Sequence, residues 1–339
     1  MRSSRSGRLF PPISTLSQVL LLNAVGGFLL ALSLFFMLSA KAVVVPAPSV
    51  TVPVQAPGSR PSTSDAKETD LPEGMLPVSS LSIQGSSGGF DGANGVYYQN
   101  PSQIPIDPDS LPGQLPSLGP RRSGPQVLIL HTHTSEAYSD GSAYYDPTVS
   151  TYDQDDRRNV VSVGDTVAAA LERRGIETLH ITAHCDTPSF NQAYTNSRAV
   201  AEEALDEHPS IRVILDLHRD SMISPQGVKY RTLIEADGLP TAQLMLVVGT
   251  SQSGLSHPGW KNNLALAARL YQLLEEETPG LMRPIYLSSN RYNQHLLPGA
   301  FLVEIGTCAN TLAEADAAAE LLAQAVARLI EEADSPTAK

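Results

Sequence analysis

Apolar and polar positions along residues 126–333 form blocks with the lengths of strands and helices. Short, mainly apolar runs predict strands buried on both faces. Longer segments with apolar residues three or four positions apart predict amphipathic helices. The predicted strands are 127–130, 176–181, 211–217, 244–248, 284–287 and 300–305, and the predicted helices are 159–174, 197–208, 261–277 and 312–332. Because strands and helices alternate, we expect an α/β fold with a largely parallel sheet flanked by helices.

A long apolar run precedes this region. Residues 19–40 carry no charge, and as a helix they would extend about 33 Å, enough for a bilayer core of about 30 Å. Arginines in residues 1–18 predict that this short segment is cytoplasmic and that the rest of the chain lies outside the membrane. The alternative is a cleaved signal peptide, since residues 40–42 resemble a cleavage site.

Residues 41–125 have the composition of a linker. They contain 14 of the 26 prolines, together with Ser- and Gly-rich patches. Such a segment buries too little apolar surface to offset the entropy lost on ordering, so we expect a disordered tether. A small loop-rich domain around residues 95–98 is the alternative. The catalytic domain is expected to span 126–339.

Charge and cysteine content exclude several classes of protein. With 23 Lys and Arg against 35 Asp and Glu, the formal net charge is −12, which argues against a nucleic-acid partner. Two cysteines, Cys185 and Cys308, exclude a Cys-rich zinc ribbon or an iron–sulfur site, and whether they pair is open. Any metal must be held by His and carboxylates.

Polar residues at the ends of three predicted strands suggest such a metal site. The strand 127–130 is followed by His131, His133 and Glu136. His218 directly follows the strand 211–217, and Glu304 lies inside the strand 300–305. Carboxyl ends of parallel strands share one edge of a sheet, which is where sites form. A catalytic zinc often takes two His and one Glu and keeps its fourth position for water.

We therefore predict that His133, Glu136 and His218 bind zinc and that Glu304 is the general base, in the manner of zinc carboxypeptidase-like sheets. His131 is the alternative to His133, either as the ligand or as the group that orients it. Glu304 has a structural alternative, as partner of Arg219 or Arg291.

Three further residues are candidates for binding the substrate or the oxyanion, namely Arg219, Arg291 and His295. His295 has the alternative of capping a turn. The remaining histidines follow no predicted strand and are expected on the surface or in turns: His180, His184, His208 and His257.

Three segments resemble the stage II sporulation protein P family of endospore-forming bacteria: 127–136, 213–221 (VILDLHRDS) and 292–311 (YNQHLLPGAFLVEIGTCANT). The resemblance implies a fold similar to zinc-dependent N-acetylmuramoyl-L-alanine amidases. It also implies a membrane-anchored peptidoglycan hydrolase at the sporulation septum, acting in engulfment with a lytic transglycosylase and other sporulation membrane proteins. It marks the 131–136 cluster, His218 and Glu304. The amidase pattern takes its Glu ligand from the start of the first helix, where this chain has Asn159, so Glu136 is the expected substitute.

The expected reaction is hydrolysis of the amide between N-acetylmuramic acid and the stem peptide. A carboxypeptidase or endopeptidase acting on the same stem peptide is the alternative enzyme. An inactive wall-binding scaffold is the alternative outside enzymes.

Overall fold

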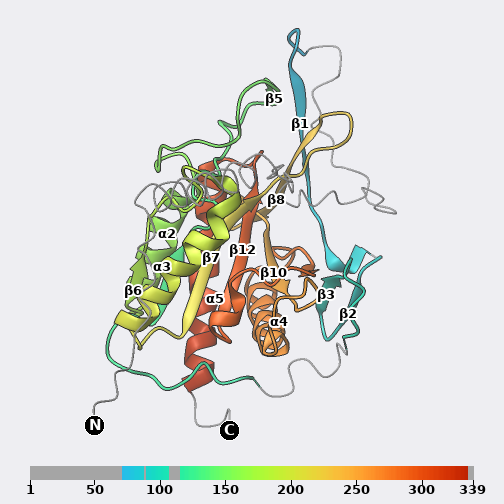
Figure 1. The fold of residues 1–339 in the computed structure, drawn as a ribbon. Coiled ribbons are helices and arrows are strands. Elements are labelled where there is room, and N and C mark those ends of the chain that lie inside the picture. The colour runs from blue at the N-terminus through green and yellow to red at the C-terminus, as the bar shows by residue number, and fades with distance from the viewer. Residues whose placement is uncertain (1–70, 88, 107–114, 335–339) are drawn as a thin grey trace, which may run out of the picture. The chain divides into compact units, whose positions relative to one another are not determined.

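The computed structural model describes residues 71–87, 89–106 and 115–334. Within these ranges, one eight-stranded sheet has the order β2-β3-β11-β10-β12-β7-β4-β6, and a four-stranded sheet has the order β5-β1-β8-β9 (Figure 1). The strands are β1 Leu76–Leu81, β2 Asp91–Ala93, β3 Val96–Gln99, β4 Val127–Leu130, β5 Tyr144–Tyr145, β6 Thr178–His180, β7 Val213–Asp220, β8 Lys229–Ala236, β9 Leu239–Ala242, β10 Leu244–Gly249, β11 Ile285–Ser288 and β12 Ala300–Thr307. The helices are α2 Val160–Glu172, α3 Ala193–Glu207, α4 Trp260–Glu277 and α5 Leu312–Asp334. The predicted α/β class is confirmed.

Seven strands of the large sheet form two parallel blocks that run in opposite directions, and the eighth, β2, pairs antiparallel with β3. β6, β4, β7 and β12 are parallel to one another, and so are β10, β11 and β3. The blocks meet at the antiparallel pair β10–β12. The carboxyl ends of β4, β7 and β12 therefore lie at the same end of the sheet, where the strands finish, and this end is called here the β7 edge. The carboxyl ends of β10 and β11 lie at the opposite edge, called here the β10 edge.

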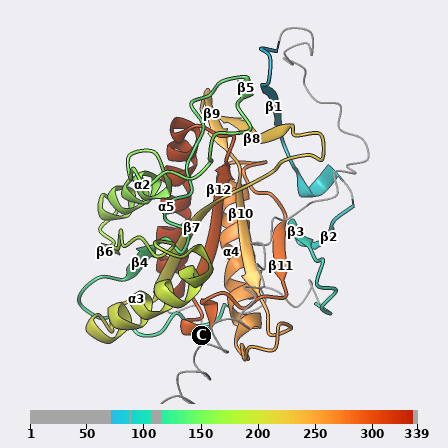
Figure 2. The same ribbon diagram turned by 45° about the horizontal axis from the view of Figure 1, so that its top comes forward.

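Alternation along the strands decides which side chains leave the core. Residues 213, 215 and 217 of β7 pack into the main core with α2, α4 and α5, whereas Ile214 packs into a second core with α3. Figures 1 and 2 show α3 and α5 on opposite faces of the sheet. Because successive side chains point to opposite faces, Asp216 and His218 lie on the α3 face. Residues 301, 303 and 305 of β12 enter the main core, which leaves Glu304 on the α3 face as well.

The hairpin of β8 and β9 lies in a stretch for which the apolar pattern predicts no element. Asp237 and Gly238 form its turn with φ values of 51° and 78°. A two-residue turn of this kind needs positive φ at both positions, which an Asp-Gly pair adopts readily. That pair is the sequence signal for the hairpin.

Part of the predicted linker is folded. β1 pairs in parallel with β8, and β3 pairs in parallel with β11. Val96 and Tyr98 of β3 are only 1% and 2% exposed and belong to the main core. The predicted boundary at residue 126 therefore lies inside the folded unit. The strands are too short to show a period against a background rich in Pro, Gly and Ser.

The predicted membrane anchor, residues 19–40, lies outside the described residues. Among the helices of the described ranges, none is long and apolar enough to cross a membrane.

Residues 71–125 are predicted to be needed for stability. A chain of residues 126–339 loses the buried Val96 and Tyr98 and leaves the edges of β8 and β11 unpaired, which favours aggregation. Loss of large core side chains costs about 2–5 kcal/mol each. Urea unfolding should therefore show a chain of residues 71–339 to be several kcal/mol more stable than one of 126–339. Equal stability of the two chains would show that β1–β3 contribute nothing to the free energy of unfolding, as expected of a linker.

Candidate active site

Two of the predicted zinc ligands meet at the β7 edge. Glu136 Oε2 lies 3.3 Å from Nδ1 of His218, and both side chains are buried. Burial opposes both charges, but the neighbouring His218 lowers the pKa of Glu136, and Asp216 and Glu136 raise the pKa of His218 well above its ordinary value. Two ligands of a tetrahedral zinc, each about 2.1 Å from the metal, lie about 3.4 Å apart. The spacing of Glu136 and His218 matches that separation.

Glu136 also lies against the start of α2. The backbone N–H of Val160 donates to the Glu136 carbonyl at 2.9 Å, and Ala137 bridges to Asn159. Asn159 caps the helix, with its Oδ1 accepting from the N–H of Val161 at 2.9 Å. Glu136 thus reaches the first turn of α2 from the loop after β4. The backbone of Glu136 contacts this helix terminus, while its carboxylate lies against His218 and the N–H of Arg219.

Asp216 contacts the other side of the His218 ring. Its Oδ1 is 3.1 Å from Nε2 of His218. The carboxylate also accepts hydrogen bonds from the N–H of Thr132 at 2.8 Å and from its hydroxyl at 2.7 Å. Asp216 is therefore a charge partner of the ring on the side away from Glu136, although Nε2 of His218 makes no hydrogen bond with any described residue. The candidate residues named from sequence omit Asp216, although its position two residues before His218 on one strand places both on the same face.

His133 has a ring nitrogen available next to this pair. Its ring lies 5.4 Å from that of His218 and stacks on Phe190 at 4.1 Å with an interplanar angle of 8°. Its Nδ1 is buried and has no hydrogen-bond partner among the described residues. Burial lowers the pKa of His133, which favours the neutral ring that a metal ligand requires.

His131, by contrast, has both ring nitrogens engaged. Nδ1 lies 3.2 Å from the carbonyl of Leu217, and Nε2 lies 2.9 Å from Nε2 of His180. Burial, together with His180, lowers the pKa of His131 to about 3. The ring therefore stays neutral and ties the end of β4 to the residue before His218. His180, expected on the surface, is part of this buried contact and also lies 3.0 Å from Asp165.

Glu304 lies level with His218 in the register of β12 and β7. Its Oε2 is buried and without a partner in the described part of the chain. Burial and the neighbouring Asp220 raise its pKa to about 8. Asp220 itself is paired with Arg283 at 2.7 Å. The structural alternative for Glu304, a pair with Arg219 or Arg291, is not formed.

Arg219 has a structural task. Its Nε donates to the Ala137 carbonyl at 3.0 Å, and its Nη2 donates to the Thr151 carbonyl at 2.7 Å. The guanidinium also lies over the Tyr152 ring, 5.0 Å from the centroid. Its backbone N–H donates to Glu136 at 3.0 Å. The residue anchors the loop that carries Glu136.

Arg291 and His295 are not brought to the β7 edge. They follow β11, whose carboxyl end lies at the β10 edge. Gly249, the last residue of β10, is four residues beyond Met245, the partner of Glu304, which corresponds to about 13 Å of strand. The antiparallel β10–β12 pairing therefore places these two residues away from the candidate ligands, and their binding of substrate or oxyanion stays a prediction.

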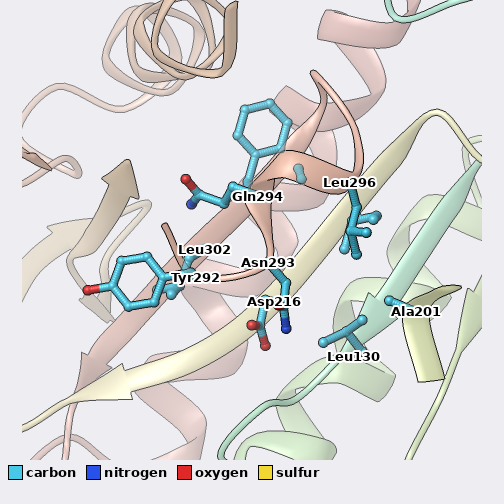
Figure 3. A pocket seen from close by; sticks show the side chains of 11 residues that line it. Leu130, Ala201, Asp216, Tyr292, Asn293, Gln294, Leu296 and Leu302 are labelled. Carbon is cyan, nitrogen blue, oxygen red and sulfur yellow. The ribbon is translucent and has the colours of Figure 1, made fainter. Parts of the chain in front are cut away.

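A small, mainly apolar pocket adjoins the site on the α3 face. Residues of β4, β7, β12, α3 and the segment 292–296 line it. Figure 3 shows the Asp216 carboxylate at its centre beside Asn293, with Tyr292 on one side and Leu130 on the other.

As they stand, no three His, Cys, Asp or Glu side chains of the described residues are arranged to hold a metal ion. Cys185 and Cys308 are buried and free, so they are not paired with each other.

Comparison with known proteins identifies a family. The family described as Stage II sporulation protein P (SpoIIP) matches residues 92–327. A curated "Stage II sporulation protein P" of Bacillus subtilis (strain 168) is 29% identical over 224 residues, which are 62% of this chain and 53% of the relative. The match thus spans about half the length of that relative.

Solved structures resemble the chain in part. The N-acetylmuramyl-L-alanine amidase Ami1 from Mycobacterium smegmatis is 15% identical with a TM-score of 0.39, covering 62% of this chain and 98% of that one. The N-acetylmuramoyl-L-alanine amidase AmiC2 of Nostoc punctiforme is 16% identical with a TM-score of 0.35, covering 62% of this chain and 98% of that one. Both TM-scores are low, so the likeness is limited.

The contact between His131 and His180 predicts an intolerance to a larger residue at Gly164 of α2. A Cβ atom there would lie 2.6 Å from Nε2 of His180 and 2.7 Å from Nε2 of His131. Overpacking costs about 1–3 kcal/mol, whereas Ala gains about 1 kcal/mol over Gly inside a helix. We expect Gly164→Ala to lower the free energy of unfolding by up to about 2 kcal/mol, measured by urea denaturation.

The matched control is the same substitution in a His180→Ala background. Removing one ring makes room for the new methyl group, so Gly164→Ala should cost less there, as a double-mutant cycle detects. An equal cost in both backgrounds would show that the imidazole contact is not the cause.

Proposed function

The chain belongs to the stage II sporulation protein P family, and we propose that it is a zinc-dependent peptidoglycan hydrolase. The observation that carries the proposal is the Glu136–His218 pair, whose atoms lie 3.3 Å apart beside the unpartnered nitrogen of His133. Glu304, the unpartnered carboxylate level with His218, completes the set that metal-assisted hydrolysis needs.

His133, Glu136 and His218 would hold the zinc. The donor set fits, because two nitrogens and one carboxylate are typical of catalytic zinc and leave one position for water. When bound, zinc would polarise the scissile carbonyl and lower the pKa of water to about 7. Asp216, whose Oδ1 lies 3.1 Å from Nε2 of His218, would add a negative charge beside this ligand set.

Glu304 would act as the general base. Its buried Oε2 has no competing partner in the described residues, so in its ionised form Glu304 can accept the proton of the attacking water and pass it to the leaving amine. Arg283 holds the nearby Asp220 at 2.7 Å, which keeps that second carboxylate engaged. Glu304 is therefore the carboxylate available for proton transfer, because Asp220 is held in an ion pair.

The proposed bond is the amide between N-acetylmuramic acid and the stem peptide. Support comes from the family resemblance, and endopeptidase cleavage of the stem peptide is the alternative outcome. Mass spectrometry of digested peptidoglycan separates the two, because an amidase releases intact stem peptides with a free amino terminus, whereas an endopeptidase cuts within the stem peptide.

The setting of the enzyme is part of the same proposal. Residues 19–40 would anchor the chain in the cell membrane, with the hydrolase outside it. Action at the sporulation septum with a lytic transglycosylase stays a prediction from the family resemblance.

Ligand variants test the metal. His218→Ala and Glu136→Ala should reduce the zinc content of the purified protein far below one equivalent and abolish hydrolysis, because each removes a ligand. His131→Ala is the matched control, since loss of a group that only orients a ligand costs about 10–100-fold in affinity or activity. Zinc content by atomic emission and release of dye from labelled peptidoglycan are the measurements. Full zinc occupancy in Glu136→Ala would move the carboxylate ligand elsewhere.

Glu304→Gln separates proton transfer from metal binding. The amide keeps the shape but is a far weaker base, so turnover should fall by about 10²–10⁴-fold while zinc stays bound. Glu320→Gln, on the exposed side of α5, makes the same chemical change away from the site and should leave turnover unchanged. Loss of zinc in Glu304→Gln would make Glu304 a ligand, and normal turnover would exclude it as the base.

A further inference from the structure

A second group of cationic and imidazole side chains lies at the β10 edge. His257 comes from the loop between β10 and α4, and Arg291 and His295 come from the segment between β11 and β12. The two imidazole rings are 6.5 Å apart, and Nη1 of Arg291 donates to the carbonyl of Ser256 at 3.0 Å. These three residues are called here the basic cluster. It is separate from the proposed active site, because the two lie toward opposite edges of the sheet.

Each member of the basic cluster has a buried nitrogen without a partner. These atoms are Nε2 of His257, Nδ1 of His295 and Nε of Arg291, and no described residue bonds to them. His257 is only 1% exposed, contrary to the surface position expected from sequence. Leaving a buried polar group unpaired costs about 1–3 kcal/mol, more for a charged one. Three such groups in one cluster indicate a ligand that accepts hydrogen bonds.

The charges around the basic cluster favour an anion. Arg198 of α3 faces Arg291 and His295, and the carboxylate that also faces His295, Glu202, is held by Arg198 at 2.7 Å. Burial together with the cationic neighbours lowers the pKa of His257 to about 4 and lowers that of His295. A bound anion would relieve this repulsion.

The start of α4 adds to the same preference. Its capping residue, Gly259, has no side chain to accept from the first N–H groups, and its first turn contains no acidic residue. Such a helix terminus carries a partial positive charge, although the N–H groups of Trp260 and Asn262 already donate to the carbonyls of His257 and Gly259. His257 lies two residues before Gly259, so the basic cluster and this terminus are adjacent.

We propose that the basic cluster binds a phosphate group. A tetrahedral oxyanion accepts hydrogen bonds in several directions, which suits donors from three separate positions better than a planar carboxylate does. A metal ion is disfavoured, because the Arg291 guanidinium would lie beside it. Arg291 and His295 are half-buried, whereas His257 is buried, so a ligand would approach from the side of Arg291 and His295.

Calorimetric titration of the purified full-length protein with inorganic phosphate tests the site. Saturable binding with one phosphate per chain is expected at fixed ionic strength. Arg291→Gln should weaken it by about 10–100-fold, the range for loss of a charge-assisted hydrogen bond. Arg157→Gln is the matched control, since that side chain is 88% exposed and removes the same charge elsewhere. In histidine ring ¹⁵N spectra, phosphate should shift His257 and His295 but not His208.

The outcomes separate the source of the phosphate from the existence of the site. Binding of glycerophosphodiester as well as inorganic phosphate supports a ligand carried on a polymer or lipid, and binding of inorganic phosphate alone supports free phosphate. Absence of saturable binding, equal weakening by Arg157→Gln, or equal affinity for acetate would overturn the proposal. None of these results depends on hydrolysis, so they test the phosphate site independently of the proposed activity.

Discussion

The buried His218 between two carboxylates is the constraint on which the site depends. Asp216 and Glu136 lie on opposite sides of its ring, at 3.1 Å and 3.3 Å. Burying three ionisable groups is costly unless their charges and hydrogen bonds are matched. The match is made by neighbours from separate elements: Thr132 after β4 donates to Asp216, and the backbone of Arg219 in β7 donates to Glu136. The end of β4, the end of β7 and the start of α2 are therefore held together by one polar cluster.

The same cluster explains how a metal and a proton would compete. A proton on His218 is stabilised by both carboxylates, which is why its pKa is raised. Metal ligation requires the neutral ring, so binding of zinc would release that proton and put a larger positive charge between the same two carboxylates. The two carboxylates therefore stabilise a positive charge at this point, as the binding of a metal ion would require.

Much of the site was predictable from sequence, because the β4 and β7 strands are apolar and their polar ends are easy to find. His133, Glu136, His218 and Glu304 all lie at the β7 edge. Arg291 and His295 lie away from these residues for one physical reason. The sequence shows where β10 and β11 are but not their direction, and the antiparallel β10–β12 pair turns their carboxyl ends to the other edge. β1 and β3 were missed because their stability comes from pairing with distant strands rather than from their own pattern.

A sheet made of two opposed parallel blocks has carboxyl strand ends at both of its edges, so ligands can be bound at both. α3 connects the two regions. Its Tyr194 ring lies 5.4 Å from the His133 ring, and its Ser197 hydroxyl lies 2.8 Å from the Thr132 hydroxyl. Nδ2 of Asn293, in the segment that carries Arg291 and His295, donates to that same Ser197 hydroxyl at 3.0 Å. Thr132 also donates to Asp216, so hydrogen bonds run from Asp216 through Thr132 and Ser197 to Asn293. α3 therefore contacts both the proposed active site and the segment that carries Arg291 and His295, and a displacement of α3 would disturb the two together.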